Sequence, residues 1–233
     1  MKTLRIGLLG LGQIGSAFYS MIQMKRDYFA REIGVDIEIA KVAEKDRAKL
    51  RKLRVPESVV CHDASEIIRD PLIDAVVELI GGTVAARQLV KGALRAGKHV
   101  ITANKALLAE YGDEIFELAD RVNRWVFFEA SVGGGIPVIK ALREGLVANR
   151  IESIHSIING TSNYILTQMT IEGKDFSDAL KEAQAKKYAE ADPTLDVEGI
   201  DAAHKLAILT RFAFGGKVKF EDIYCEGISE IGK

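Results

Sequence analysis

A glycine-rich turn between a short apolar run and a helical pattern constrains the fold of this chain more than any other feature. The run from Leu4 to Leu9 reads L-R-I-G-L-L and has the length and composition of a buried parallel strand. The turn G-L-G-Q-I-G follows, and helical periodicity continues from Ser16 to about Arg31. A strand, a glycine turn and a helix in this order are typical of the unit that begins a parallel α/β sheet.

The glycines of this turn, Gly10, Gly12 and Gly15, match G-x-G-x-x-G. In a dinucleotide-binding turn the first glycine permits the tight bend, the second lets the backbone approach a pyrophosphate, and the third lets the helix pack on the strand. The N-terminus of the helix then faces the phosphates. We therefore predict that NAD or NADP binds here. The alternative is an ordinary glycine-rich turn between a strand and a helix.

The end of the second predicted strand bears on the choice of cofactor. This strand spans Ile37–Ala43 and is followed by Glu44, Lys45 and Asp46, where such a fold binds the adenosine ribose. An acidic side chain there favours the free 2′-hydroxyl of NAD, and a basic one favours the 2′-phosphate of NADP. Glu44 and Asp46 favour NAD and Lys45 favours NADP, so the sequence leaves both cofactors open. We expect NADP to be accepted through Lys45.

Further units of the same kind follow along the chain. Strand patterns occur at Ile73–Ile80, Lys98–Thr102 and Trp125–Phe128. The first of them leads through Gly81-Gly82-Thr83 into a helix that reaches about Ala96. This repetition predicts a Rossmann-type doubly wound parallel sheet, in which ligands bind beyond the carboxyl ends of the strands.

Lys105 is the first candidate catalytic residue. Thr102-Ala-Asn-Lys105 has the pattern of a capped entry into a helix over Ala106–Ala109. Lys105 and Thr83 both follow strand ends, near the crevice where the nicotinamide half of a dinucleotide is expected. The alternative for Lys105 is a solvated lysine in a first helical turn.

A change of composition predicts a dinucleotide-binding domain over residues 1–132 and a smaller α+β domain over residues 133–233. The segment E-A-S-V-G-G-G-I-P from Glu129 to Pro137 suits either a hinge or carbonyl oxygens that meet a hard cation or a ligand, and the alternative is a flexible linker. Beyond it we expect a helix over Val138–Leu146, a strand over Ile151–Ile158 and a helix over Phe176–Tyr188. Asn159-Gly160 is a turn signal, followed by Thr161 or Ser162 as a helix cap.

The acid-rich stretch from Tyr188 to Lys205 is the second candidate site. It reads Y-A-E-A-D-P-T-L-D-V-E-G-I-D-A-A-H-K, with helical periodicity after its glycine. Asp201 and Lys205 therefore share one helix face. Glu190 and Asp196 belong to the irregular lead-in, where helix stability requires no carboxylates. The alternative is a solvated acidic loop before a helix with one exposed ion pair.

Composition and charge exclude several functions. Lysine plus arginine number 32 and aspartate plus glutamate 33, so no net field attracts nucleic acid or an anionic membrane. No apolar stretch approaches the roughly 18 residues of a membrane span and no signal peptide begins the chain, so we expect a cytoplasmic protein. Cys61 and Cys225 suit a reducing compartment, with one disulfide left open. The histidines are scattered and predict no zinc site or catalytic triad.

Segments throughout the chain carry a resemblance to a known family. They are G-L-G-Q-I-G, T-A-N-K-A-L-L-A, F-E-A-S-V-G-G-G-I-P, I-N-G-T-S-N-Y-I-L and A-E-A-D-P-T-L-D-V-E-G-I-D-A-A-H-K. Together they resemble homoserine dehydrogenase, and the last is the most specific of them. The resemblance implies reduction of aspartate 4-semialdehyde to homoserine with NADH or NADPH, on the route to threonine and methionine. It also implies a homodimer or higher homo-oligomer.

The resemblance further implies roles for individual residues. Lys105 and Lys205 look like the catalytic lysines of the family, with Lys205 as proton donor oriented by Asp201. The expected substrate-binding residues are Glu190, Asp196, Gly160, Thr161 and Tyr188. The expected cofactor-binding residues are Gly10, Gly12, Gln13, Ile14, Gly15, Lys45, Thr83 and Lys105. Glu129, Val132, Gly134 and Ile136 look like a monovalent-cation site, which sodium would fill.

The chemistry of this reaction suits these side chains. Hydride delivery to an aldehyde carbon builds negative charge on its oxygen, which a lysine ammonium can stabilise and protonate. Carboxylates at Glu190 and Asp196 can hold the α-ammonium group of the substrate, while the nicotinamide performs the redox step.

The chain departs from the family pattern in two places. Lys187 stands where the family usually has glycine, directly before the tyrosine of the acidic motif. Family members usually continue past Glu226-Gly227-Ile228 through a segment that packs over the cofactor domain, so we expect a truncated form or a second chain that supplies this cover. The alternative functions are an NAD(P)-binding module without catalysis and another amino-acid or sugar dehydrogenase.

Overall fold

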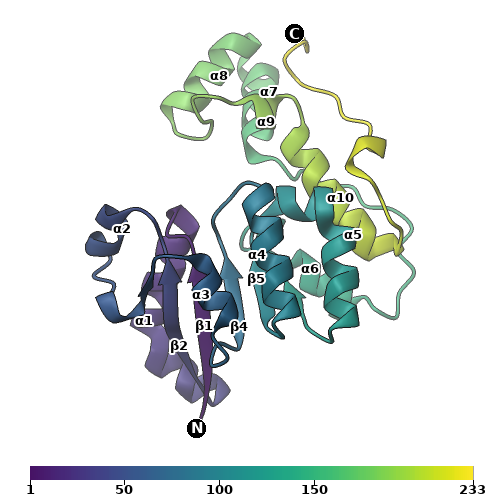
Figure 1. Ribbon diagram of the computed structural model, residues 1–233. Helices are drawn as coiled ribbons and strands as arrows, with labels where there is room; N and C mark the ends of the chain where they lie inside the picture. Colours follow the sequence, from purple (N-terminus) through teal and green to yellow (C-terminus); the bar gives the residue numbers. More distant parts are fainter. Residues whose placement is uncertain (233) are drawn as a thin grey trace. The chain divides into compact units, whose positions relative to one another are not determined.

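The computed structural model describes residues 1–232. The chain divides into two compact units, the first over Met1–Ser131 and the second from Val132 onward. Figure 1 shows the strands in the first unit and only helices and irregular segments in the described part of the second. The boundary lies one residue before the one expected from the sequence.

The first unit is built on a six-stranded parallel sheet with the order β3-β2-β1-β4-β5-β6. Figure 1 labels strands β2, β1, β4 and β5 of this sheet. Its strands are β1 Lys2–Leu9, β2 Val35–Ala43, β3 Val60–Cys61, β4 Ala75–Glu78, β5 His99–Thr102 and β6 Val126–Phe127. The strand order reverses direction between β1 and β4, which makes their carboxyl ends the switch point where ligands bind in such sheets. The predicted Rossmann-type doubly wound fold is therefore confirmed.

Helices connect the strands of this sheet. They are α1 Gln13–Ile33, α2 Arg47–Lys52, α3 Ala64–Arg69, α4 Val84–Arg95 and α5 Lys105–Arg121, with short 3₁₀ turns η1 Glu57–Val59 and η2 Glu129–Ser131. Polar side chains begin three of these helices: Asp46 accepts from the N–H of Ala48, Asp63 forms a capping box with Glu66, and Asn104 accepts from the N–H of Leu107. Sequence patterns alone predicted neither α2, α3 nor β3, which are short.

The core of the first unit lies along β1 and β4, the central strands. Leu8, Val76 and Val77 are almost completely buried, because central parallel strands are covered on both faces. Tyr19 and Ile22 of α1 belong to one hydrophobic cluster with Leu8 and Val77. Burial of the sheet holds the carboxyl ends of its strands in a fixed arrangement, and the candidate cofactor residues follow those ends.

The second unit is helical within residues 132–232. Its elements are α6 Val138–Lys140, a π-helical turn η3 Ala141–Gly145, α7 Gly160–Glu172, α8 Phe176–Ala185, α9 Thr194–Val197, α10 Ile200–Phe214 and the 3₁₀ turn η4 Phe220–Asp222. The strand predicted over Ile151–Ile158 is wrong: this segment is irregular, and no strand in the described residues pairs with it. A strand needs a neighbour for its backbone hydrogen bonds, so the described part is helical rather than α+β.

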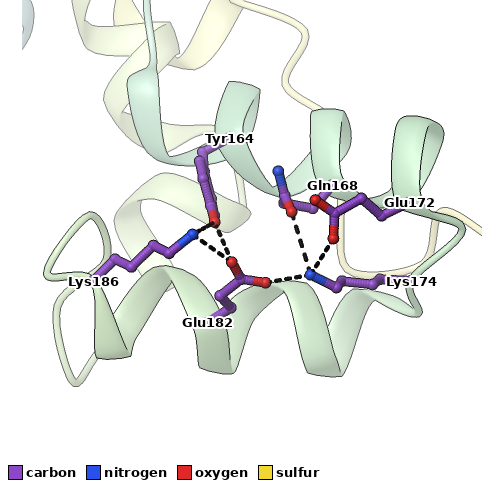
Figure 2. A network of polar contacts seen from close by, with 6 residues as sticks. All are labelled: Tyr164, Gln168, Glu172, Lys174, Glu182 and Lys186. Atoms are coloured by element: carbon purple, nitrogen blue, oxygen red, sulfur yellow. Dashed lines mark hydrogen bonds and ion pairs between the residues drawn. The ribbon is translucent and has the colours of Figure 1, made fainter.

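Small residues and a charged network join α7 to α8. Ala179 and Ala183 are completely buried against Ile165, which lets the two helices approach closely. Beside this contact, Glu182 accepts hydrogen bonds from Lys174 and Lys186, both at 2.5 Å, and from the hydroxyl of Tyr164 at 2.7 Å (Figure 2).

These hydrogen bonds have electrostatic consequences for the two groups at the centre of the network. Those from Lys174, Lys186 and Tyr164 lower the pKa of Glu182 to about 2. Conversely, the hydrogen bond to Glu182 raises the pKa of Lys186. The network therefore stays charged over the whole ordinary pH range.

Helix α8 ends in a turn that places Lys187 in the left-handed region, with φ +61°. The N–H of Lys187 donates to the carbonyl of Gln184 at 3.0 Å, and that of Tyr188 donates to Ala183 at 2.8 Å. This is the Schellman pattern, in which the left-handed position usually belongs to glycine. The lysine that departs from the family pattern therefore stands where the backbone favours glycine.

The cysteines and the helices settle two further points raised by the sequence. Cys61 is buried, Cys225 is exposed, and both are free thiols, so the disulfide left open by the sequence is not formed. None of the helices within residues 1–232 is long and apolar enough to cross a bilayer.

Candidate functional site

The glycine turn between β1 and α1 has the geometry that its motif predicts. Gly10 has φ +92°, and an added Cβ there would lie 2.8 Å from the carbonyl oxygen of Leu79. An added Cβ on Gly15 would lie 2.1 Å from the carbonyl oxygen of Gly10. Glycine is therefore needed at both positions, first for the bend and then for the close approach of α1.

Gly12 differs from the other two glycines because open space surrounds it. A Cβ added there would meet no atom of the described residues within 4 Å. Gly12 is also the N-cap of α1, which no side chain caps among residues 1–232. Gln13 and Ile14 form the exposed first turn of that helix. An approachable backbone at an uncapped helix N-terminus fits a pyrophosphate.

A cleft of about 590 Å³ opens beside this turn. Its walls come from the glycine turn, the residues that follow β2 and β4, the start of α3 and one side of α4. Lys45 and Lys49 are on this wall, and the predicted Lys45 is exposed. Thr83 lies at the N-cap of α4, partly exposed, while Lys105 opens α5.

The carboxylate of Glu44 is bound into the turn. One oxygen accepts from the N–H of Leu11 at 2.7 Å, and the other accepts from the N–H of Asp46 at 2.9 Å. Burial raises the pKa of Glu44, but these backbone hydrogen bonds outweigh it, so the pKa lies below its ordinary value. Glu44 thus connects the end of β2 to the glycine turn, a structural role that its position in the sequence did not reveal.

Helix α5 begins with the cap predicted for it, one residue earlier than expected. Asn104 caps the helix through its side-chain oxygen, 3.1 Å from the N–H of Leu107. The helix continues to Arg121, far beyond the predicted Ala109, because apolar residues line one face of it to the end. Lys105 is thus the first residue of a long and well-packed helix.

The second unit brings two distant motifs together around Lys205. The ammonium nitrogen of Lys205 lies 2.5 Å from the carboxylate of Asp201, one turn earlier on α10, and donates to the carbonyl of Ile158 at 2.7 Å. Asp201 is only 5% exposed. The alternative of an exposed ion pair on a solvated helix is therefore wrong for this pair.

Asn159 is the residue that sequence reasoning missed. Its amide nitrogen donates to Asp196 at 2.7 Å and to Asp201 at 2.9 Å, and its oxygen caps α7 by accepting from the N–H of Ser162 at 2.7 Å. The cap predicted at Thr161 or Ser162 is therefore wrong, since asparagine before Gly160 performs it. The turn signal at this asparagine was visible, but its contacts 37 and 42 residues away were not.

The start of α7 also binds the acidic stretch directly. The hydroxyl of Thr161 donates to the carbonyl of Tyr188 at 2.8 Å, and that of Ser162 donates to the carbonyl of Asp196 at 2.9 Å. Asp196 lies in the short helix α9 rather than in an irregular lead-in, which corrects the sequence prediction. Three of the predicted substrate residues, Thr161, Tyr188 and Asp196, are therefore fixed together.

Two other predicted substrate residues are exposed. Glu190 carries an exposed side chain, and its backbone carbonyl accepts from Gln184 at 3.1 Å. Gly160 is exposed as the first residue of α7. The side chain of Tyr188 is 58% exposed and its ring packs against that of Tyr164, with centroids 5.0 Å apart.

The residues predicted for a monovalent cation lie at the end of the first unit and the beginning of the second. Glu129 opens η2, and Val132 is buried. Gly134 has φ +59° and is exposed, as is Ile136. No group of three or more acidic, histidine or cysteine side chains in the described residues could hold a metal ion. A site made of backbone carbonyls stays a prediction.

Comparison with known proteins gives consistent matches over both units. The protein-family model described as the homoserine dehydrogenase NAD-binding domain matches residues 10–129. A second family model, described as homoserine dehydrogenase, matches residues 137–233. Homoserine dehydrogenase from Neisseria gonorrhoeae is 50% identical over 99% of this chain and 53% of its own length. The chain thus spans about half the length of the curated relatives it matches.

Solved structures agree with these matches. A homoserine dehydrogenase from Thiobacillus denitrificans has a TM-score of 0.93 at 50% identity, over 99% of this chain and 53% of that one. A hyperthermophilic archaeal homoserine dehydrogenase in complex with NADPH has a TM-score of 0.82 at 29% identity, over 99% of this chain and 75% of that one.

Proposed function

The chain belongs to the homoserine dehydrogenase family, and from this premise we propose that it interconverts aspartate 4-semialdehyde and homoserine with NADPH or NADH. The observation that carries the proposal is the group formed by Lys205, Asp201, Asn159 and Asp196. A lysine ammonium held by a buried carboxylate, beside a second carboxylate, suits a substrate that carries both an aldehyde and an ammonium group.

Lys205 is proposed as the proton donor to the substrate oxygen. An ammonium group has three donors, and two of those of Lys205 go to Asp201 and Ile158. The third can meet the oxygen on which negative charge develops. Asp201 fixes the direction of this lysine, and Asn159 fixes Asp201 in turn.

The remaining residues of the second unit are proposed to hold the amino-acid end of the substrate. Asp196 and Glu190 would bind its α-ammonium group, and Tyr188 would contact the substrate beside them. Gly160 and Thr161 belong to the first turn of α7, where backbone N–H groups favour a carboxylate.

The first unit is proposed to bind the dinucleotide, which when bound supplies or accepts the hydride. The open backbone at Gly12 and the first turn of α1, Gln13 and Ile14, would face the pyrophosphate. Thr83 and Lys105, which follow the carboxyl ends of β4 and β5, would face the nicotinamide half.

The geometry around Glu44 favours NADPH over NADH. Both oxygens of Glu44 already accept backbone hydrogen bonds, so the carboxylate is less available to a ribose 2′-hydroxyl. Lys45 and Lys49 line the same cleft and would attract a 2′-phosphate. Lys45→Ala should lower the ratio of NADPH to NADH affinity, whereas Lys52→Ala, on the exposed side of α2, should leave it unchanged. An unchanged ratio in Lys45→Ala would remove this preference.

The catalytic proposal is tested by adding homoserine and NADP⁺ to the purified chain and following the rise in NADPH absorbance. Lys205→Ala should abolish turnover and leave NADPH affinity nearly intact, because Lys205 belongs to the unit that carries the substrate residues. Substantial turnover in this variant would contradict the assignment of Lys205 as the proton donor. Tight NADPH binding by the wild-type chain without turnover would favour a cofactor-binding module, and turnover with other hydroxy compounds alone would favour another dehydrogenase.

Assembly and cation binding complete the proposal. The chain is proposed to form a homodimer or higher homo-oligomer, which sedimentation analysis would reveal. Glu129 and the carbonyls of Val132, Gly134 and Ile136 are proposed to hold sodium. Equal thermal stability in sodium and in a large organic cation would argue against that site.

A further inference from the structure

Glu78, the last residue of β4, is a completely buried carboxylate. Within residues 1–232 it forms no ion pair with a lysine, arginine or histidine. Instead, one oxygen accepts from the hydroxyl of Thr102 at 2.6 Å, and the other accepts from the N–H of Ile80 at 3.0 Å. A completely buried carboxyl group has these two hydrogen bonds in place of water, so its presence at the end of a central strand calls for a role.

The hydrogen bonds of Glu78 belong to a closed chain of contacts. The hydroxyl of Thr102 also accepts from the N–H of Asn104 at 3.0 Å. The amide of Asn104 donates to the carbonyl of Gly82 at 2.6 Å, and Gly82 lies two residues after Ile80. The chain of contacts therefore joins the end of β4, the loop after it, the end of β5 and the start of α5.

These elements form the wall of the expected nicotinamide crevice. Glu78 and Thr102 are directly paired in the register of β4 and β5. The loop from Leu79 to Thr83 begins on the cleft beside the glycine turn, and its Gly81 and Gly82 both have positive φ values, +74° and +68°. A loop with two left-handed glycines has little rigidity of its own, so its shape depends on outside contacts.

We propose that Glu78 is a positioning residue for the cofactor crevice. It holds the loop that carries Thr83 and the helix start that carries Lys105 in the one arrangement that fits the nicotinamide half of NADPH. The inference rests on the proposed cofactor binding, and it adds a residue with no direct contact to the cofactor.

A carboxylate is required because Glu78 must accept two hydrogen bonds at once. In Glu78→Gln the amide group would face either the N–H of Ile80 or the hydroxyl of Thr102. If the NH2 of the glutamine faces Ile80, two hydrogen-bond donors oppose each other, the NH2 and the N–H of Ile80. Facing Thr102, it forces a hydroxyl that already accepts from Asn104 to find another acceptor for its proton.

The free protein can relieve this mismatch by a small shift of the loop or of the start of α5. Binding of NADPH then has to reverse the shift, so the cost appears as a weaker affinity. We expect the Kd for NADPH to rise on the order of 10-fold in Glu78→Gln. A structural role alone would lower stability without this change.

Lys98→Met is the matched control. Lys98 is buried in the same sheet, directly before β5, and donates to the carbonyls of Asp70 and Ile73 at the opposite edge. Its loss should lower the Tm while the Kd for NADPH changes less than about twofold. If Lys98→Met and Glu78→Gln weaken NADPH binding alike, or if Glu78→Gln binds like the wild-type chain, the proposal is overturned.

Thr102 provides a second test that does not depend on folding of the Glu78 variant. Thr102→Val keeps the shape but removes the hydroxyl, and should weaken NADPH binding as Glu78→Gln does. Thr102→Ser keeps the hydroxyl and should restore affinity. Equal affinity of the valine and serine variants would overturn the proposal.

Both tests read binding rather than turnover. A wild-type chain that binds NADPH without oxidising homoserine therefore refutes the proposed catalysis and leaves these tests in force. A wild-type chain that does not bind NADPH overturns both proposals.

Discussion

Replacing Lys187 with glycine should stabilise the second unit. Lys187 has φ +61° in the Schellman turn that ends α8. A residue with a Cβ costs about 1–2 kcal/mol in this conformation, and glycine avoids that cost. Glycine in turn loses about 0.5–1 kcal/mol more backbone entropy on folding. The difference of these two ranges is about 0–1.5 kcal/mol, so we expect Lys187→Gly to be more stable than the wild-type chain by about 0.75 kcal/mol.

Urea unfolding followed by circular dichroism at 222 nm measures this change. For a chain of this size, a gain of 1 kcal/mol corresponds to a Tm rise of about 2–4 °C. Lys187→Ala is the control, because it removes the same side chain and keeps the strained backbone. It should stay within about 0.5 kcal/mol of the wild-type chain. The fluorescence of Trp125, the one tryptophan of the sequence, reports on the first unit in the same experiment.

The stabilities of Lys187→Gly and Lys187→Ala together show whether the backbone at Lys187 is strained. If Lys187→Gly is no more stable than Lys187→Ala, the left-handed backbone at this position stores no strain, and the reasoning from its φ value is refuted. A gain seen in both variants would instead assign the effect to the lysine side chain.

The remaining predictions concern the two candidate sites and the network between α7 and α8. Gly15→Ala should cost about 2 kcal/mol or more in thermal unfolding, because its Cβ would meet the Gly10 carbonyl at 2.1 Å, whereas Gly12→Ala should fold normally and weaken NADPH binding in a titration. Asn159→Ala should lose about 2–4 kcal/mol in urea unfolding, since it removes a helix cap and two hydrogen bonds to carboxylates; a loss below 1 kcal/mol would contradict this. The pKa of Glu182 is lowered from 4.5 to about 2, so its stabilising effect is complete above pH 4.5 and is lost as the pH falls toward 2. Glu182→Gln should flatten stability against pH in that window, and an unchanged slope would contradict the assignment.

The acidic stretch from Tyr188 to Lys205 shows how the structure changed the weight of the alternatives. A solvated loop and an exposed ion pair were reasonable from its composition. The structure instead buries Asp201 and joins Lys205 and Asp196 to the motif around Asn159. Glu190 keeps its exposure, so the stretch combines a rigid buried part with an accessible carboxylate.

Features governed by local geometry were predictable from the sequence alone. The roles of Gly10 and Gly15 follow from sterics within one turn, and the structure shows the close contacts that require them. The pairing of Asp201 with Lys205 follows from their spacing by four on a helix. The cap at Asn104 follows from its position before a periodic segment. In each case the interacting atoms are close along the chain.

Contacts between distant segments required the tertiary structure. Glu78 meets Thr102 because β4 and β5 pair in register, 24 residues apart, and nothing local marks a strand-end glutamate as buried. Asn159 meets Asp201 across 42 residues. The segment Ile151–Ile158 has the pattern of a strand but is irregular in the structure. A strand forms only where a second strand pairs with it, and the local sequence of a segment does not show whether such a partner lies beside it.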